Sequence, residues 1–309
     1  MRTRISSEFV GEKLVGAVST YYKKGDPRFD YAVENAENYD KHTVPLVVID
    51  GSPDDNRARV RKALELRGAL VVESLVNGIA TQRQQGVGYA IAHGAEKVVG
   101  HEPEKVLMSD FATQITDALD EYDILTIGRT NSAIETLPSI QAWTESMAGY
   151  VLQKTHHLPP DTLSGGRGFT LAGAEVLARY PSTQKDFNNW IYLYYTILEA
   201  RAEQLPTGGI KIDLNHPPLM TSQEEGSPVF DRKRFDQFKL QFDYLLQRGD
   251  VDPVAQKLAA AVIYAMDGLT DMDTNDTFKQ QLKRLEHLLV NEFGYKPTRA
   301  IGRKIRKLI

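Results

Sequence analysis

Residues 44–52 constrain the fold of this chain more than any other segment. An apolar run here ends in a lone carboxylate, Asp50, and the turn residues Gly51 and Ser52 follow it. Continuous apolar runs of this length are typical of strands that are buried on both faces of a parallel sheet. Open α/β sheets bind their ligands at the edge where such strands end. The segment therefore predicts an α/β protein with Asp50 at a ligand-binding edge.

Strands and helices alternate through about the first two-thirds of the sequence. Further strands are expected at 14–22, 69–75, 105–110, 123–128, 167–170 and 210–214. Helices are expected at 27–39, 54–67, 80–94, 115–122, 136–156 and 186–204. Alternation at this spacing predicts a Rossmann-like, mostly parallel sheet that is sandwiched by helices and built from right-handed crossovers.

The sequence changes in character near residue 226. Beyond this point only helices are expected, at 230–247, 253–266, 277–293 and 299–309. The segment before them, 221–227, is polar and rich in turn residues. We therefore predict an α/β domain of residues 1–226 and an α-helical C-terminal extension of residues 227–309.

Composition narrows the class of protein. The chain is 41% hydrophobic and 25% charged, as expected for a globular protein, and its formal net charge of -4 argues against a general nucleic-acid binder. It has no cysteine, which excludes disulfides and thiolate zinc sites. No apolar run approaches the roughly 20 residues that span a bilayer, and the N-terminus has no apolar signal core. We expect a cytoplasmic protein.

Two strand-end carboxylates are candidates for ligand binding. Asp50 can accept hydrogen bonds from a nucleobase or a ribose hydroxyl, with Gly51 allowing close approach; the alternative is an aspartate that caps the next helix or closes a turn. Asp110 follows the strand expected at 105–110, where it can hold a hard cation on a diphosphate. One carboxylate is a poor magnesium or manganese site unless other ligands complete it.

Two arginine-containing segments offer positive charge. Arg83 precedes Gly86 and Gly88, a pattern that suits close approach of the backbone to a phosphate; the alternative is glycines that relieve helix packing. Arg129 follows the strand expected at 123–128 and can neutralise a leaving diphosphate, or else lies in a surface loop.

Three further segments contain residues that are candidates for binding or catalysis. Ser164, Gly165 and Gly166 form an unusual glycine-rich loop that is expected to be ordered. Asp186 heads an expected helix, as a catalytic carboxylate or simply as its N-cap. For His216, metal ligand and structural histidine are both open.

In this order the segments resemble the GT-A fold glycosyltransferases, and family 2 of that group in particular. The resemblance covers about residues 12–218 and rests on short motifs in sequence order. These are the turn at 18–22, the Asp-Gly-Ser turn at 50–52, the Gly-x-Gly-x-Ala stretch at 86–90, the glycine loop at 164–166, Asp186 and His216.

The resemblance implies a reaction. The expected enzyme moves a sugar from a UDP- or GDP-linked donor to an acceptor hydroxyl with inversion, and Asp186 is the base. The donor site is expected to contain Ser19, Asp50, Arg83, Gly86, Asp110 and Arg129, and the acceptor site Ser164, Gly165 and Gly166. Asp110 and His216 are expected to hold Mg²⁺ or Mn²⁺.

Two departures from the family pattern leave alternatives open. The Asp-x-Asp position has Ala112 in place of its second carboxylate, and the acidic pair before the helix has Lys185 in place of its first. These changes permit a metal-independent enzyme, or a non-catalytic binding or scaffold protein with a nucleotide-sugar fold. A nucleotidyltransferase ranks lower, because the sequence has no N-terminal glycine-rich loop followed by arginine and lysine.

The last residues, 294–309, combine apolar and basic side chains. They predict either a basic amphipathic helix at the inner face of an anionic membrane or a packed terminal helix with a solvated basic face. Membrane contact would suit a lipid-linked acceptor, and a homo-oligomer is also left open.

Overall fold

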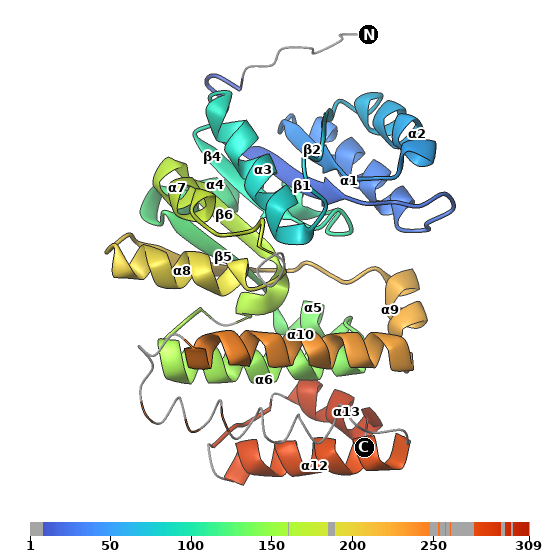
Figure 1. Ribbon diagram of the computed structural model, residues 1–309, viewed down its shortest axis with the longest axis vertical. Coiled ribbons are helices and arrows are strands. Elements are labelled where there is room, and N and C mark those ends of the chain that lie inside the picture. Colours follow the sequence, from blue (N-terminus) through green and yellow to red (C-terminus); the bar gives the residue numbers. More distant parts are fainter. Residues whose placement is uncertain are drawn as a thin grey trace. The chain divides into compact units, whose positions relative to one another are not determined.

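The computed structural model describes residues 9–159, 161–184, 189–247, 275–291, 294–297 and 299–308, with the single positions 253, 257 and 260. The chain forms two compact units (Figure 1). Unit 1 comprises residues 1–128 and 165–214, and unit 2 comprises residues 129–164 and 215–309. This grouping differs from a single cut after residue 226, and the domain boundary predicted there stays a prediction.

Unit 1 is built on one sheet. Its strands in the described residues are β1 (Val15–Thr20), β2 (Leu46–Asp50), β3 (Leu70–Glu73), β4 (Lys97–His101), β5 (Ile124–Arg129), β6 (Gly166–Thr170) and β7 (Thr207–Ile212). They lie in the order β3-β2-β1-β4-β6-β5-β7. Strands β1 to β4 pair in parallel, whereas β6 runs antiparallel to both β4 and β5. The mostly parallel sheet predicted from the sequence is confirmed.

Helices cover both faces of this sheet. Val18 and Val48 point toward α1 (Phe29–Lys41), α2 (Asp54–Glu65) and α4 (Ala112–Glu121), with which they form a buried apolar cluster. The next residues along each strand face the other way, since side chains alternate across a sheet. There Ala17 and Ile49 contact α3 (Ile79–Ala92) at Gly86. Helix α7 (Leu171–Ala178) packs beside α3, and α8 (Tyr192–Ala202) packs beside α7.

One predicted strand is wrong. Residues 105–110 form no strand; they end in a 3₁₀ helix, η1 (Met108–Phe111), and the strand of this region is β4. Pro103 has no backbone N–H for the ladder, and the amide of Lys105 donates to the carbonyl of Glu102 over 3.1 Å. The chain therefore turns directly after β4. Helices α7 and α9 (Pro218–Glu224) were also not predicted.

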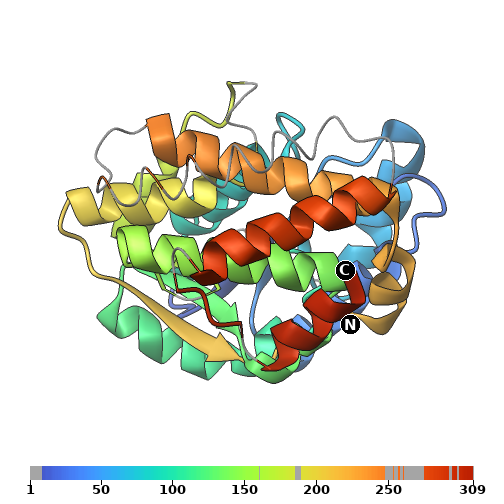
Figure 2. The same cartoon turned by 90° about the horizontal axis from the view of Figure 1, so that it is seen from below.

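Unit 2 is helical in its described part. It contains α5 (Asn131–Glu135), α6 (Ser139–His156), η2 (Thr162–Ser164), α9, α10 (Pro228–Gln247), α12 (Asn275–Asn291) and α13 (Arg299–Leu308). Figures 1 and 2 both show α10 along α6, and α13 also packs on α6. The helical extension is confirmed in the described residues, while most of the helix predicted at 253–266 lies outside them.

The basic C-terminal segment forms α13, which packs on α6 and α5 within unit 2. Ile301 is buried, Arg303 pairs with Glu135 over 2.7 Å, and the ammonium of Lys304 donates to the carbonyl of Leu137. These contacts fit the packed-helix alternative. No helix in the described parts of the chain is long and apolar enough to cross a membrane.

Candidate functional site

Asp50 ends β2 beside Thr20, the last residue of β1. Its Oδ1 accepts three hydrogen bonds, from the Thr20 hydroxyl (2.9 Å), the Ser52 amide (3.0 Å) and the Ser52 hydroxyl (2.6 Å). Its Oδ2 is buried without a hydrogen-bond partner in the described structure. One oxygen therefore fixes the carboxylate in place, and the other is left with full acceptor capacity.

The turn after Asp50 is closely packed. A Cβ at Gly51 would lie 2.3 Å from Oδ1 of Asn77 and 2.6 Å from Nε2 of Gln82, so a larger residue would displace these two side chains. The Gln82 amide donates to the carbonyl of Thr20. Asp50 does not cap α2, whose N-cap is Pro53 and which has no side-chain cap. Asp50 thus closes its own turn, and these hydrogen bonds hold the C-terminal ends of strands β1 and β2 together.

Glu102 is the carboxylate that follows β4. Its Oε2 lies 2.9 Å from the ammonium of Lys105, and its Oε1 lies 4.0 Å from Nη2 of Arg83. Burial would raise the pKa of Glu102, but Lys105 and then Arg83 outweigh burial and lower it to about 2. Glu102 is therefore ionised at neutral pH, between two cations.

Arg83 comes from the first half of α3, and its side chain extends to β1 of the sheet. Its guanidinium is 2% exposed, and Nη1 donates to the carbonyl of Ala17 in β1 over 3.1 Å. Neither Nε nor Nη2 makes a well-formed hydrogen bond to a described residue. The guanidinium also acts on the Tyr192 hydroxyl, whose pKa burial raises to about 12 while Arg83 opposes the rise. A buried cation with unused donors is a strong anchor for an anion.

His101, the last residue of β4, is hydrogen-bonded to the backbone of Glu102. Its Nδ1 lies 2.8 Å from the carbonyl of Glu102, which can only accept, so Nδ1 carries the proton. Its Nε2, 2.7 Å from the hydroxyl of Tyr39, then accepts from that hydroxyl. Burial, with a smaller effect from Arg83, lowers the pKa of His101 to about 3. Both ring nitrogens of this neutral imidazole are occupied.

Gly166 opens β6 next to the end of β4, and Gly165 directly precedes it. Gly165 has φ +78°, and a Cβ there would lie 2.0 Å from Oε1 of Glu102. A Cβ at Gly166 would be 3.1 Å from Ile127. The predicted glycine loop is therefore a strand start that lies against the Glu102 carboxylate.

The structure places the other predicted site residues of unit 1, Ser19, Gly86 and Asp110, in three different environments. Ser19 is buried in β1, and its hydroxyl has no hydrogen-bond partner among the described residues. Gly86 lies inside α3, where a Cβ would be 3.2 Å from Ile49, which fits the alternative of close helix packing. Asp110 lies exposed in η1, and its carboxylate is 2.8 Å from Nε2 of His42. The role predicted for Asp110 depended on a strand that the structure places elsewhere.

Arg129, Ser164 and His216 belong to unit 2. The guanidinium of Arg129 is buried and engages both oxygens of Asp161 and also Glu145. His216 donates its amide to the Thr136 hydroxyl, and its Nε2 lies 3.3 Å from Glu224. The amide of Ser164 donates to the carbonyl of Asp161. Asp186 lies outside the described residues.

Sequence reasoning missed Glu102 and Lys105. Their signal is present, because Val98 and Val99 form an apolar pair that is soon followed by an acid and then Pro103. The later apolar run at 106–108 competes with it. Proline directly after the acid was the better indicator of a strand end.

The described side chains around Glu102, at the sheet edge of unit 1, do not form a suitable site for a divalent cation. Among the described residues, no three histidine or acidic side chains come together as metal ligands do. Glu102 is paired to Lys105, and both nitrogens of His101 are engaged. We therefore derive no step through a metal ion.

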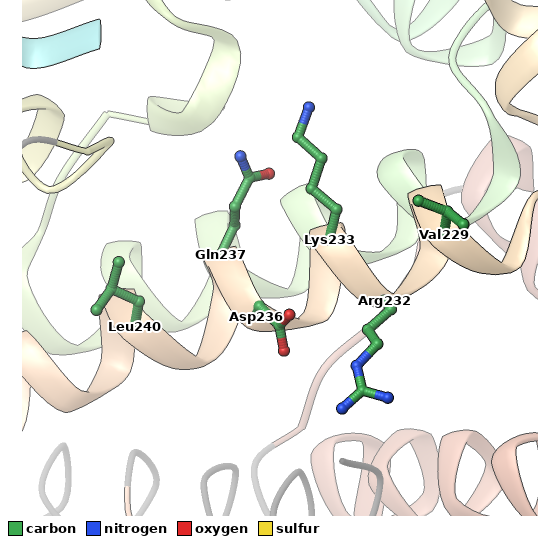
Figure 3. Close-up of a pocket in the computed structure, with 6 residues that line it drawn as sticks. All are labelled: Val229, Arg232, Lys233, Asp236, Gln237 and Leu240. Atoms are coloured by element: carbon green, nitrogen blue, oxygen red, sulfur yellow. The ribbon is translucent and has the colours of Figure 1, made fainter. Parts of the chain in front are cut away.

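A shallow hollow elsewhere lies along α10 in unit 2 (Figure 3). It is lined by Val229, Arg232, Lys233, Asp236, Gln237 and Leu240. All six belong to one helix, whereas small-molecule sites are enclosed by several converging elements. No residue predicted for the site lines it.

Comparison with solved structures identifies the fold. A mannosyltransferase from Pyrobaculum calidifontis, solved in complex with GDP-Man and Mn²⁺, is 16% identical to this chain and superposes with a TM-score of 0.51. The match covers 96% of this chain and 84% of the mannosyltransferase. The chain has a GT-A-like fold. No protein-family model matches the sequence, and no curated protein gives a significant match.

Two further solved structures resemble this GT-A-like chain more weakly. S. aureus TarS 1-349, in complex with UDP-GlcNAc, is 12% identical, with a TM-score of 0.45 over 96% of this chain and 83% of TarS 1-349. A 4-diphosphocytidyl-2C-methyl-D-erythritol synthase from Anaerococcus prevotii is 8% identical, with a TM-score of 0.43 over 69% of this chain and 93% of the synthase.

Proposed function

We propose that this chain is a glycosyltransferase that moves a sugar from a nucleotide-diphosphate sugar to an acceptor hydroxyl. The observation that supports this most is the sheet edge of unit 1. There the fixed carboxylate of Asp50 ends β2, and Glu102, flanked by Arg83 and Lys105, follows β4. In open α/β sheets this edge is the ligand site, and the GT-A-like fold uses it for nucleotide sugars by analogy.

The nucleoside is proposed to bind at the ends of β1 and β2. Oδ2 of Asp50 and the hydroxyl of Ser19 are both buried and lack partners among the described residues. Buried polar atoms are normally satisfied, so each favours a ligand that supplies the missing hydrogen bond. A base N–H or a ribose hydroxyl would do so.

The diphosphate is proposed to lie beside β4. Arg83 and Lys105 bring two positive charges to the Glu102 carboxylate, and cations placed in this way stabilise the charge that develops on a leaving diphosphate. Glu102 thus takes the place in the site that the sequence had suggested for Asp110. Arg129, already paired with two carboxylates, is proposed to stabilise unit 2 instead.

We retain Asp186 as the proposed base, in which case the anomeric centre inverts. The specific alternative is a non-catalytic nucleotide-sugar-binding protein, which the pairing of Glu102 with Lys105 also accommodates. Asp186→Asn separates the two: an enzyme loses turnover and keeps nucleotide affinity. For an active wild type, the anomeric configuration of the product tests inversion, and a retained configuration contradicts this role.

The first test of the site is nucleotide binding by calorimetry, with UDP, GDP and their sugar conjugates. Asp50→Asn should weaken binding about tenfold, because it removes a charged acceptor worth about 1.4 kcal/mol. Asp54→Asn is the matched control, since that carboxylate is 91% exposed and pairs with Arg57 over 3.0 Å. If no nucleotide binds the wild type, the proposal is wrong.

A further inference from the structure

We infer that the ammonium of Lys105 takes the place of a divalent cation at the strand-end carboxylate Glu102, so that this chain binds nucleotide diphosphates without a metal. The inference rests on the proposed function and concerns the same sheet edge. Its basis is the mismatch between the side chains found there and those that a cation requires.

The pair is built into the local chain. Glu102 and Lys105 are the first and last residues of one turn, closed by the hydrogen bond from the Lys105 amide to the Glu102 carbonyl. Pro103 stands at the second position of the turn, where its fixed φ is favourable. The Lys105 ammonium then lies 2.9 Å from Oε2 of Glu102, with the two side chains 15% and 14% exposed. The pair therefore forms with no rearrangement of distant segments.

Arg83 and Lys105 already supply positive charge at the sheet edge beside Glu102. Lys105 lies 2.9 Å and Arg83 4.0 Å from the ionised carboxylate of Glu102, so two positive charges already face this group. Glu104, in the same turn, is a second carboxylate, whose pKa burial and then Glu102 raise while Lys105 and Arg28 oppose the rise. A divalent ion at Glu102 would add two more positive charges within a few ångströms of both cations, where Coulomb repulsion is strong.

Among the described residues, no third histidine or acidic side chain joins Glu102 and Glu104 as a metal-ligand cluster. The His101 ring donates to the Glu102 carbonyl and accepts from Tyr39. Asp110, which lies in η1, pairs with His42. Pro103 and Gly165 offer no side-chain donor. Magnesium and manganese need several oxygen ligands, whereas a diphosphate needs only cations and hydrogen-bond donors, which Lys105 and Arg83 supply.

The test is calorimetric titration of the full chain with GDP and with UDP, in EDTA and in Mn²⁺. The nucleotide that binds should do so with affinities within about twofold of each other in the two buffers. Binding that improves about tenfold or more with Mn²⁺ would overturn the inference and leave the proposed function standing. If neither nucleotide binds in either buffer, both fail.

Lys105→Ala gives a readout that a purely structural lysine would not produce. In EDTA, nucleotide affinity should fall about tenfold or more. Mn²⁺ should then restore part of the loss, because Glu102 is freed to bind a cation. Lys105→Arg should keep metal-free binding, which guards against a folding defect in the alanine variant.

Lys97→Ala is the matched control. Lys97 also belongs to the β4 region and also forms a lysine–carboxylate pair, 2.6 Å from Asp120, but at the opposite end of the strand. Its removal should leave nucleotide affinity unchanged in both buffers. Equal affinities of Lys105→Ala and Lys97→Ala in EDTA would overturn the inference.

Discussion

Gly165, just before β6, and Glu102, just after β4, are in direct contact: a Cβ on Gly165 would lie 2.0 Å from Oε1 of Glu102. Gly165 also has φ +78°, a backbone conformation that side chains rarely adopt. Two independent constraints thus select glycine here. The contact determines where the Glu102 carboxylate can lie, and with it the Lys105 ammonium.

Gly165→Ala should therefore destabilise the protein and weaken nucleotide binding. We expect a loss of about 2–3 kcal/mol in unfolding free energy, from backbone strain and from displacement of Glu102. Gly25→Ala is the matched control, since Gly25 has φ +82° but nothing within 4 Å of its Cβ position. It should cost about 1 kcal/mol and leave binding unchanged. Urea denaturation and calorimetry measure the two effects, and equal affinities of the variants would contradict this expectation.

His101 should make the fold sensitive to acid. Its folded-state pKa, lowered to about 3, lies below the ordinary value of 6.5, so the unfolded chain takes up a proton first as pH falls. The stability that neutral His101 provides is complete above about pH 6.5 and is lost toward pH 3, at up to about 1.4 kcal/mol per pH unit. Glu102, with a pKa lowered to about 2, adds a loss in the same direction only below its ordinary 4.5.

His101→Gln keeps a donor and an acceptor but does not titrate. Urea denaturation between about pH 6.5 and about pH 4.5 should show a smaller loss of stability for this variant than for the wild type, because Glu102 does not contribute in that window. Parallel losses would show that His101 is not the titrating group.

Arg129→Met should be strongly destabilising. The guanidinium is buried with Asp161 and Glu145, and its removal leaves two buried carboxylates without their cation. Breaking a buried pair in this way costs about 3–5 kcal/mol. Arg28→Met removes an exposed pair with Asp26 and should cost about 1 kcal/mol or less. Chemical denaturation compares them; a small effect at Arg129 would contradict its assignment to the unit 2 core.

Deprotonation of Asp231, at the start of α10, should lower the stability of the protein as pH rises. Burial, and then nearby Glu225, raise its pKa from 3.8 to about 6, so the folded chain holds this proton more tightly than the unfolded chain. The protonated form contributes stability below pH 3.8 that is lost as pH rises through about 6. Asp231→Asn should therefore be more stable than the wild type at neutral pH, with a difference that shrinks toward pH 4. Asp236→Asn, exposed on the same helix, is the control, and thermal melts across this range measure the difference.

The sequence predicted most strands because their apolar runs are buried on both faces. Val47, Val48 and Ile49 are all at most 1% exposed, so the run is continuous. The error near β4 has the same origin: the run at 106–108 is also apolar, yet Leu107 is 38% exposed and Met108 belongs to a 3₁₀ helix. Apolar character alone does not distinguish a strand from a loop that contributes one side chain to the core.

Site residues were harder to predict than strands, because partners come from distant segments. Arg83 and Arg129 look alike in sequence, but Arg83 keeps unused donors while Arg129 meets Asp161, 32 residues away. Gly165 was predicted as an ordered loop. Its contact with Glu102 depends on the antiparallel placement of β6 beside β4, which no local pattern encodes.

The division into units has a consequence for how this protein can be engineered. Residues 129–164, which include α6, lie between two segments of unit 1, while α10 and α13, which pack on α6, come from the end of the chain. The C-terminal helices are therefore not an exchangeable cassette. A chimera that replaces residues 227–309 alone would confront α6 with an unmatched partner surface, so α6 must be grafted together with them.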